Sequence, residues 1–291
     1  MLDLFHAALI QPFAEFEFMR RALVGAVALA IAAAPVGVFL MLRRMSLTGD
    51  AMSHAILPGA AIGYLAAGLS LPAMTIGGLV AGVAVAVGAG AVARASVLGE
   101  DVALAAFYLV SLALGVTIVS MKGSNVDLLH VLFGTVLALD DQALFLIAGI
   151  ATATLLGFAV IFRPLVAESV DPVFLASVAR AGAPVHLVFM GLVVMNLVGA
   201  FHALGTLMAV GLMMLPAASA RLWVDDLSAM IGVAAGSGML AAIVGLLASY
   251  HFGLPAGPAI ILTAGLVYVL SLVFGRRGLL VARLTRPHLE A

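Results

Sequence analysis

An aspartate and a histidine in the segment GDAMSHAILPG, Asp50 and His54, are the residues with the clearest chemical potential. They are four residues apart, so a helix would place them on one face, one turn apart, with Ser53 beside them. A carboxylate and an imidazole together can hold a divalent cation such as zinc or manganese. Two alternatives remain open: Asp50 caps the start of a helix while His54 bonds to a backbone carbonyl, or the three side chains form a hydrolase constellation.

Four further residues are candidate contacts for a cation: Asp127, His130, His202 and His251. Asp127 and His130 are three residues apart, which is a same-face spacing on a helix. Each histidine taken alone is more often packed or interfacial than functional. His186 carries no distinct signal.

The elements that position these residues are predicted by an unusually apolar composition. The 291 residues are 65% hydrophobic and 9% charged, which indicates a protein embedded in a bilayer. A formal net charge of -1 gives no basic field for nucleic acid. The absence of cysteine excludes disulfides and thiolate metal sites, so any metal must meet histidine, carboxylate, hydroxyl or carbonyl ligands.

Uncharged runs between the charges predict an all-α, polytopic integral membrane protein. A spanning helix needs about 20 residues, so three of the runs are one span long and three are about two spans long. This predicts nine transmembrane helices, with eight or ten also compatible. The long runs contain breaks at Gly68 to Pro72, Gly199 to Gly205 and Tyr250 to Pro258, where Gly, Pro or His interrupt the apolar residues. The stretch 128–139 is too short to cross and is predicted to be re-entrant or interfacial.

Basic residues predict the orientation, because Lys and Arg near span ends stay in the cytoplasm. With the N-terminus outside and the C-terminus cytoplasmic, ten of the thirteen basic residues lie inside. We divide the chain into an N-terminal interfacial amphipathic segment (1–17), a transmembrane domain (18–275) and a cytoplasmic tail (276–291).

One predicted cytoplasmic loop, Arg163 to Pro184, contains a short helix signature. Asp171 is a suitable N-cap, Pro172 suits the first helical position and Gly182 suits a C-terminal stop. Such a helix is either a surface connector or a docking element for a partner. The single lysine, Lys122, is not preceded by glycine, so the chain has no P-loop for ATP and is not predicted to be an enzyme.

Several segments together resemble a known family. They are GVFLMLRRMSLTGDAMSHAILPGAAIGYL, GEDVALAAFYLVSLALG, VDLLHVLFG, DPVFLASVARAGAPV, GTLMAVGLMMLPAASARL and SYHFGLPAGPAIIL. In this order they are similar to the membrane permeases of zinc, manganese and iron ABC importers, which are related to cobalamin and siderophore importers. The resemblance runs from about Phe18 to Gly275, and the DxxSHxxLPG block is its most specific part.

The resemblance implies a multi-pass subunit of the bacterial cytoplasmic (inner) membrane that pairs as a homodimer. It implies two further partners, a cytoplasmic ATP-binding subunit and an extracytoplasmic metal-binding protein. By motif, Asp50 and His54 match positions implicated in metal passage. The segment Asp171 to Gly182 matches the coupling helix that contacts the ATPase. Its residues carried over for that role are Asp171, Pro172, Ala179, Arg180 and Gly182. Where the family often has an acidic or amide residue before the PxGP motif, this chain has Gly253.

From these observations we expect an ABC importer subunit for a divalent transition metal, with zinc preferred and no permanently bound cofactor. The preference rests on the predicted outer histidines, which suit zinc better than the oxygen ligands that manganese accepts. The alternatives are a manganese or iron permease of the same type, and a proton-coupled secondary transporter with Asp50 and His54 as the relay.

Overall fold

The structure is a computed structural model that describes residues 9–68, 70–97, 99–121, 137, 139–171 and 182–280. Within these ranges the side chains of residues 119–121, 202–204 and 206–208 are not described. The described ranges contain helices and no strand. The helices are α2 (Gln11–Glu15), α3 (Glu17–Leu42), α4 (Ser46–Ala55), α5 (Leu57–Ala67), α6 (Leu71–Ala95), α7 (Glu100–Met121), α9 (Asp141–Val170), α11 (Gly182–Arg221), α12 (Leu227–Phe252) and α13 (Ala256–Phe274).

Seven helices in the described residues are long and apolar enough to cross a membrane: α3, α6, α7, α9, the first half of α11, α12 and α13. This confirms a polytopic helical membrane protein but does not support nine spanning helices. Neither of the two remaining predicted spans is a single helix long enough to cross. One consists of the short helices α4 and α5, and the other is the part of α11 that follows a kink at Gly205, where φ is 76° and ψ is 169°.

The chain breaks where the sequence predicts. Between α5 and α6 the helix ends at Ala67 and resumes at Leu71, and α12 ends before Gly253, which has a left-handed φ of 64°. The break between α4 and α5 lies at Ile56, because Pro58 in the first turn of α5 has no N–H to bond to the preceding turn. The carbonyl of Ala55, the last residue of α4, accepts a 2.9 Å hydrogen bond from the Ser111 hydroxyl of α7.

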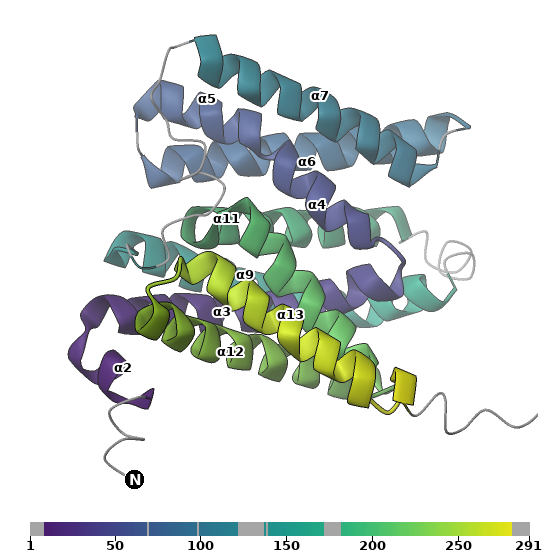
Figure 1. The fold of residues 1–291 in the computed structure, drawn as a ribbon. Helices are drawn as coiled ribbons and strands as arrows, with labels where there is room; N and C mark the ends of the chain where they lie inside the picture. The colour runs from purple at the N-terminus through teal and green to yellow at the C-terminus, as the bar shows by residue number, and fades with distance from the viewer. Residues whose placement is uncertain are drawn as a thin grey trace, which may run out of the picture.

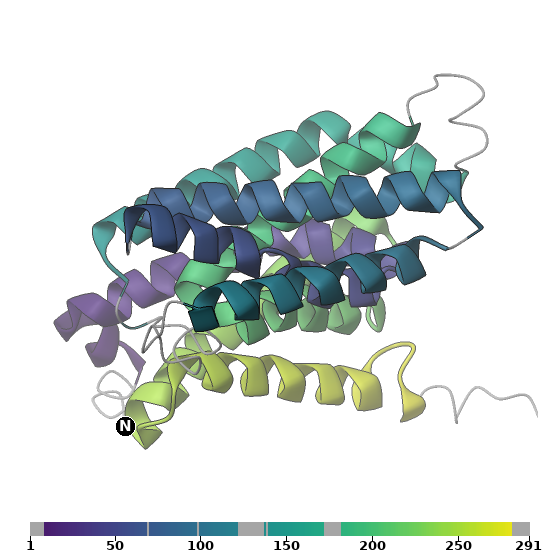
Figure 2. The same cartoon turned by 90° about the horizontal axis from the view of Figure 1, so that it is seen from above.

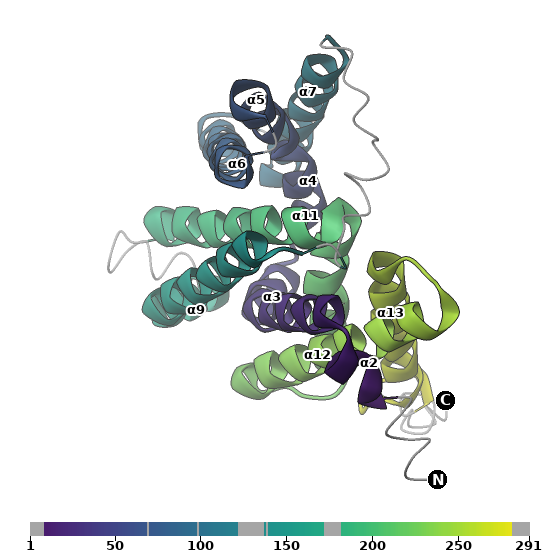
Figure 3. The same cartoon turned by 90° about the vertical axis from the view of Figure 1, so that its left-hand side faces the viewer.

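Helix α11 lies in the middle of the molecule. In Figures 1 and 3, α4, α5, α6 and α7 lie on one side of it and α3, α9, α12 and α13 on the other, and α11 contacts members of both groups. Seen from above, the long helices run side by side along similar directions (Figure 2). Helix α4 reaches from the first group toward α11, so the helix that carries Asp50 and His54 bridges the two groups (Figure 1).

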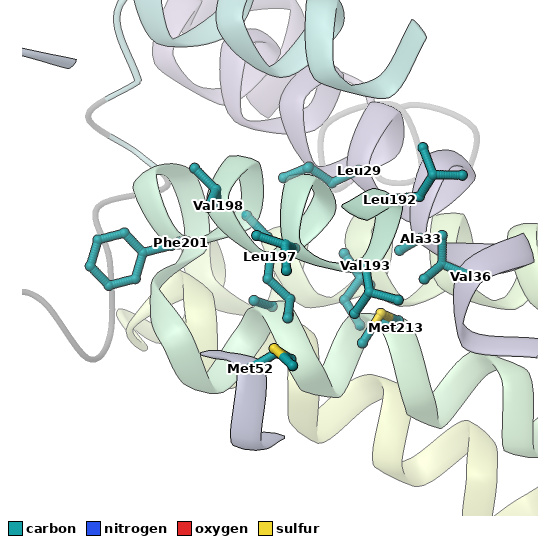
Figure 4. Close-up of a cluster of buried hydrophobic side chains, with 14 of the residues drawn as sticks. Leu29, Ala33, Val36, Met52, Leu192, Val193, Leu197, Val198, Phe201 and Met213 are labelled. Atoms are coloured by element: carbon teal, nitrogen blue, oxygen red, sulfur yellow. The ribbon is translucent and has the colours of Figure 1, made fainter. Parts of the chain in front are cut away.

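Buried apolar side chains hold α4 against α3 and α11. Figure 4 shows Met52 of α4 in the same buried cluster as Met213 and Val193 of α11 and Leu29 of α3, and all four are at most 1% exposed. These contacts replace lipid around the inner face of α4 and fix its rotation.

Glycines allow several helices to approach backbone to backbone. At the crossing of α5 and α6, a methyl group on either Gly59 or Gly77 would overlap the carbonyl oxygen of the other. Gly37 of α3 likewise lies against the backbone of Met213 in α11. Small residues at such crossings are typical of membrane helices.

The loop predicted from Arg163 to Pro184 is shorter than expected. Helix α9 continues through Pro164 to Val170, and α11 begins at Gly182. The expectation took the first charge as the end of the helix, but Leu165 and Glu168 are buried against the rest of the protein and extend α9 beyond it.

Candidate metal site

Asp50 and His54 lie on one face of α4, as their spacing predicts. Asp50 Oδ1 is 3.8 Å from His54 Nε2, close enough for one cation to contact both groups after a small side-chain rotation. The Asp50 side chain is 62% exposed and that of His54 28% exposed. The carboxylate of Asp50 therefore faces outward from the single chain, and the imidazole of His54 is partly exposed beside it.

The capping alternative for Asp50 is wrong. Helix α4 begins at Ser46 with Met45 as its N-cap residue, so Asp50 is inside the helix and not at its start. Inside a helix the backbone N–H groups already have partners one turn earlier, and a carboxylate has no helix end to stabilise.

The geometry does not support the hydrolase alternative either. The Ser53 hydroxyl is buried and donates a 2.7 Å hydrogen bond to the backbone carbonyl of Asp50. A serine nucleophile needs its hydroxyl bonded to a general base such as His54.

The imidazole of His54 is held by an aromatic neighbour from another helix. Its ring stacks on Tyr108 of α7, with ring centroids 6.3 Å apart and planes 30° apart. The Nδ1 atom is buried and has no hydrogen-bond partner among the residues that the structure describes. His54 is therefore positioned by packing, and its other ring nitrogen, Nε2, is the one that lies beside Asp50 and could contact a cation.

The other candidate cation contacts do not join this pair in the described part of the chain. Asp127 and His130 lie outside the described residues, and so does the side chain of His202. His251 lies in the last turn of α12, edge-on to Tyr250 at 5.2 Å between ring centroids. Among the described residues no group of three or more His, Asp or Glu side chains is placed to hold a metal ion.

The candidate coupling residues are mostly outside the described ranges, namely Pro172, Ala179 and Arg180. Asp171 follows α9 as its C-cap residue, and its N–H donates to the Ala167 carbonyl at 2.9 Å. Gly182, which the sequence suggested as a C-terminal stop, is the first residue of α11.

Sequence reasoning missed a charged cluster that lies where α3 and α9 end and where α7 and α11 begin. Arg43 at the end of α3 donates to both carboxylate oxygens of Glu168 on α9, at 3.2 and 3.4 Å. Arg43 Nη2 is also 3.0 Å from Nδ1 of His186 on α11, and His186 Nε2 is 2.6 Å from Glu100 on α7. No spacing rule could find this cluster, because its members come from four separate segments.

The tautomer of His186 follows from its two partners. Arginine can only donate, so Nδ1 accepts from Arg43, and Nε2 carries the proton that is donated to Glu100. The guanidinium of Arg43 also lies 5.4 Å from the centroid of the Phe189 ring. The side chains of Arg43 and Glu168 are 13% and 8% exposed, so the ion pair is largely removed from solvent.

Comparisons with known proteins point to one group of transport proteins. The chain is 35% identical over 257 residues to the manganese import system permease protein ScaB of Streptococcus parasanguinis, covering 88% of this chain and 90% of the relative. It is 34% identical over 270 residues to the manganese transport system membrane protein MntC of Listeria monocytogenes, covering 92% and 95%.

Solved structures and a family model agree with these relatives. The structure of PsaBC from Streptococcus pneumoniae in complex with Fab contains a chain that is 32% identical, with a TM-score of 0.84, over 97% of this chain and 100% of that one. An inward-facing metal-chelate type ABC transporter shares the fold at 13% identity, with a TM-score of 0.68 over 86% and 84%. The model of the ABC 3 transport family matches residues 15–275. The chain belongs to the ABC 3 transport family and is a multi-pass protein of the bacterial inner membrane.

Proposed function

We propose that this chain is the transmembrane subunit of an ABC importer that moves manganese into the cytoplasm. The observation that carries the proposal is its identity of about one third, over most of its length, to permeases named for manganese import. The site supports it, because a carboxylate oxygen and an imidazole nitrogen are ligands that Mn²⁺ accepts.

Manganese replaces the zinc preference of the sequence analysis. That preference rested on histidines predicted at the outer surface, and in the described part of the chain none of them joins Asp50 and His54. The relatives named above are manganese proteins. Selection among divalent metals follows geometry and ligand type more than intrinsic affinity.

The exposure of Asp50 supports a homodimer around the transport path. Two ligands are fewer than Mn²⁺ or Zn²⁺ takes in a closed site. A second copy related by a two-fold axis would bring another Asp50 and His54 to the same axis. Such a site holds the ion loosely in one chain and more fully between two, which allows release as the helices move.

The energy for transport would come from a separate cytoplasmic ATP-binding subunit that docks at the segment 171–182, and an extracytoplasmic metal-binding protein would deliver the ion. ATP binding would shift the permease between outward-open and inward-open states.

The proposed orientation has the N-terminus outside. Ion pairs at both ends of α3 and α9 support a parallel arrangement of these two helices, with Arg21 near Asp141 at one end and Arg43 near Glu168 at the other.

The test is uptake of manganese, zinc and iron into proteoliposomes that contain this chain, its ATP-binding subunit and its metal-binding protein. We expect manganese uptake that requires ATP on the cytoplasmic side of the membrane. The rate of zinc uptake should be lower. Uptake driven by a proton gradient without ATP would support the secondary transporter instead. ATP-driven uptake of zinc alone would overturn the choice of ion.

A further inference from the structure

The cluster of Arg43, Glu168, His186 and Glu100 joins the ends of four helices at one place. Arg43 is the C-cap residue of α3, Glu168 lies in the last turn of α9, His186 lies five residues into α11 and Glu100 begins α7. Its bonds run from Glu168 through Arg43 and His186 to Glu100 without interruption. Charge-assisted bonds in a largely buried site resist separation, because breaking one leaves a charge without its partner.

Arg43 binds both helices that border the segment 171–181. Glu168 precedes this segment at the end of α9, and His186 follows it at the start of α11. A force applied to the segment reaches the chain through these two helix ends. Both ends are bonded to the same guanidinium, at 3.2 Å for Glu168 and 3.0 Å for His186.

From Arg43 the backbone leads directly into α4. Only Arg44 and Met45 separate Arg43 from Ser46, the first residue of α4. The turn is tight: Arg44 has a left-handed φ of 59°, and the N–H of Met45 donates to the Leu40 carbonyl at 2.8 Å. A non-glycine residue in this conformation is costly and leaves the turn little freedom to absorb movement. A displacement of Arg43 therefore passes to α4 and to Asp50.

A second connection reaches the same site through α7. Glu100 at the start of α7 bonds to His186, while Tyr108 and Ser111 further along α7 contact His54 and the Ala55 carbonyl. Because a helix is stiff along its axis, a movement of its first turn is carried to these contacts. Both connections end at the proposed metal site.

We propose that Arg43, held by Glu168 and His186, is a positioning residue that transmits displacement of the helix ends around segment 171–181 to α4 and its metal site. The inference rests on the proposed function in one respect, that the ATP-binding subunit docks at this segment. A purely structural role of the same ion pair would change stability without changing how α4 responds to ATP.

The test uses the complete complex and a single introduced cysteine, because the chain has none of its own. Leu47 of α4 is 84% exposed, so Leu47→Cys can carry an environment-sensitive fluorophore. The native cluster should give a change in fluorescence on addition of ATP. Glu168→Gln, which keeps the side-chain shape but removes the charge, should reduce that change about tenfold while ATP hydrolysis continues.

Two further variants separate transmission from stability. Arg43→Lys keeps the charge but cannot bind Glu168 and His186 together in the same geometry, so it should also lose most of the response. The control is Asp225→Asn, which removes an exposed ion pair with Arg277 that lies outside the cluster and should leave the response unchanged. Native-like responses in both cluster variants, or no ATP response with the native cluster, would overturn the inference.

The fluorescence measurement does not depend on which ion is carried. A complex that responds to ATP but moves no manganese would contradict the proposed function and leave the role of Arg43 supported. The opposite result is manganese uptake in Glu168→Gln and Arg43→Lys at the native ratio of ATP hydrolysed per ion transported. It would contradict the role of Arg43 and leave the proposed function supported.

Discussion

At the scale of single residues, the candidate site depends on groups that neighbouring helices hold in place. His54 is oriented by the ring of Tyr108. At the helix break that follows His54, the Ser111 hydroxyl donates a hydrogen bond to the Ala55 carbonyl. That carbonyl has no partner within its own helix, because α4 ends at Ala55 and the last carbonyls of a helix have no N–H of the same helix to accept from. Ser111 thus stabilises the end of α4, where His54 lies.

The first prediction concerns this hydrogen bond. Ser111→Ala should lower stability by about 1 kcal/mol, because the buried carbonyl of Ala55 is left unsatisfied. The measurement is the thermal unfolding midpoint of the purified protein in detergent. Thr117→Ala is the control, since that hydroxyl bonds to the Ala113 carbonyl of its own helix on an exposed surface. Equal midpoints for both variants would contradict the role given to Ser111.

Sequence reasoning at this scale found Asp50 and His54 but not their surroundings. A spacing of four residues is visible in one segment, because helix geometry alone brings such residues together. Tyr108 and the cluster around Arg43 come from distant segments, and only the packed bundle brings them together. Sequence reasoning also missed that Glu168 is buried, because a charge was taken as a sign of the membrane surface.

At the scale of elements, close contact between α5 and α6 depends on two glycines. Gly59 and Gly77 face each other so closely that neither position has room for a methyl group. The pair fixes how α5 sits on α6, and α5 continues directly from α4. The high glycine content of the sequence predicts such contacts, but not which glycines make them.

The second prediction tests this contact. Gly59→Ala should destabilise the protein by about 1–3 kcal/mol, because the added methyl group forces the two backbones apart. The matched control is Gly149→Ala in α9, where the new methyl group meets nothing within 4 Å. That control should be neutral or stabilising by about 0.5–1 kcal/mol, since alanine favours the helix. Thermal unfolding in detergent compares the two, and a midpoint for Gly59→Ala at or above that of the control would contradict the contact.

Breaks between elements were more predictable than the number of spans. Gly, Pro and His interruptions located the break before α6, the kink at Gly205 in α11 and the turn after α12. The count of nine was not supported, because the length of an apolar run does not reveal whether its helix is continuous. In α4 and α5 the run is long enough, but Pro58 divides it into helices of 10 and 11 residues.

At the scale of the whole molecule, ion pairs join helices at both ends of the bundle. Arg21 bonds to Asp141 at 2.9 Å at one end of α3 and α9, and the Arg43 cluster joins helices at the other. The ion pairs of α3 and α9 therefore lie at the two ends of these helices, as expected for helices whose apolar middle part crosses a membrane. The excess of basic residues predicts which end faces the cytoplasm.

The third prediction fixes that orientation. The test uses single cysteines at two exposed positions near opposite ends of α12. One replaces Asp225, between α11 and α12, and the other replaces Phe252, the last residue of α12. An impermeant thiol reagent added to intact cells should label Phe252→Cys and spare Asp225→Cys until the membrane is opened. The reverse pattern would show that the orientation is inverted and would place the segment 171–182 on the wrong side for an ATP-binding partner.

The central claim is that Asp50 and His54 carry the transported ion, and ATP-driven manganese uptake by site variants tests it most directly. Asp50→Ala and His54→Ala are compared with the native protein in proteoliposomes with the partner proteins, and Asp225→Ala serves as a carboxylate control away from the site. We predict that each site variant loses manganese uptake by about tenfold or more while the complex still assembles and hydrolyses ATP, and that the control transports normally. Native rates of uptake in both site variants would contradict the claim.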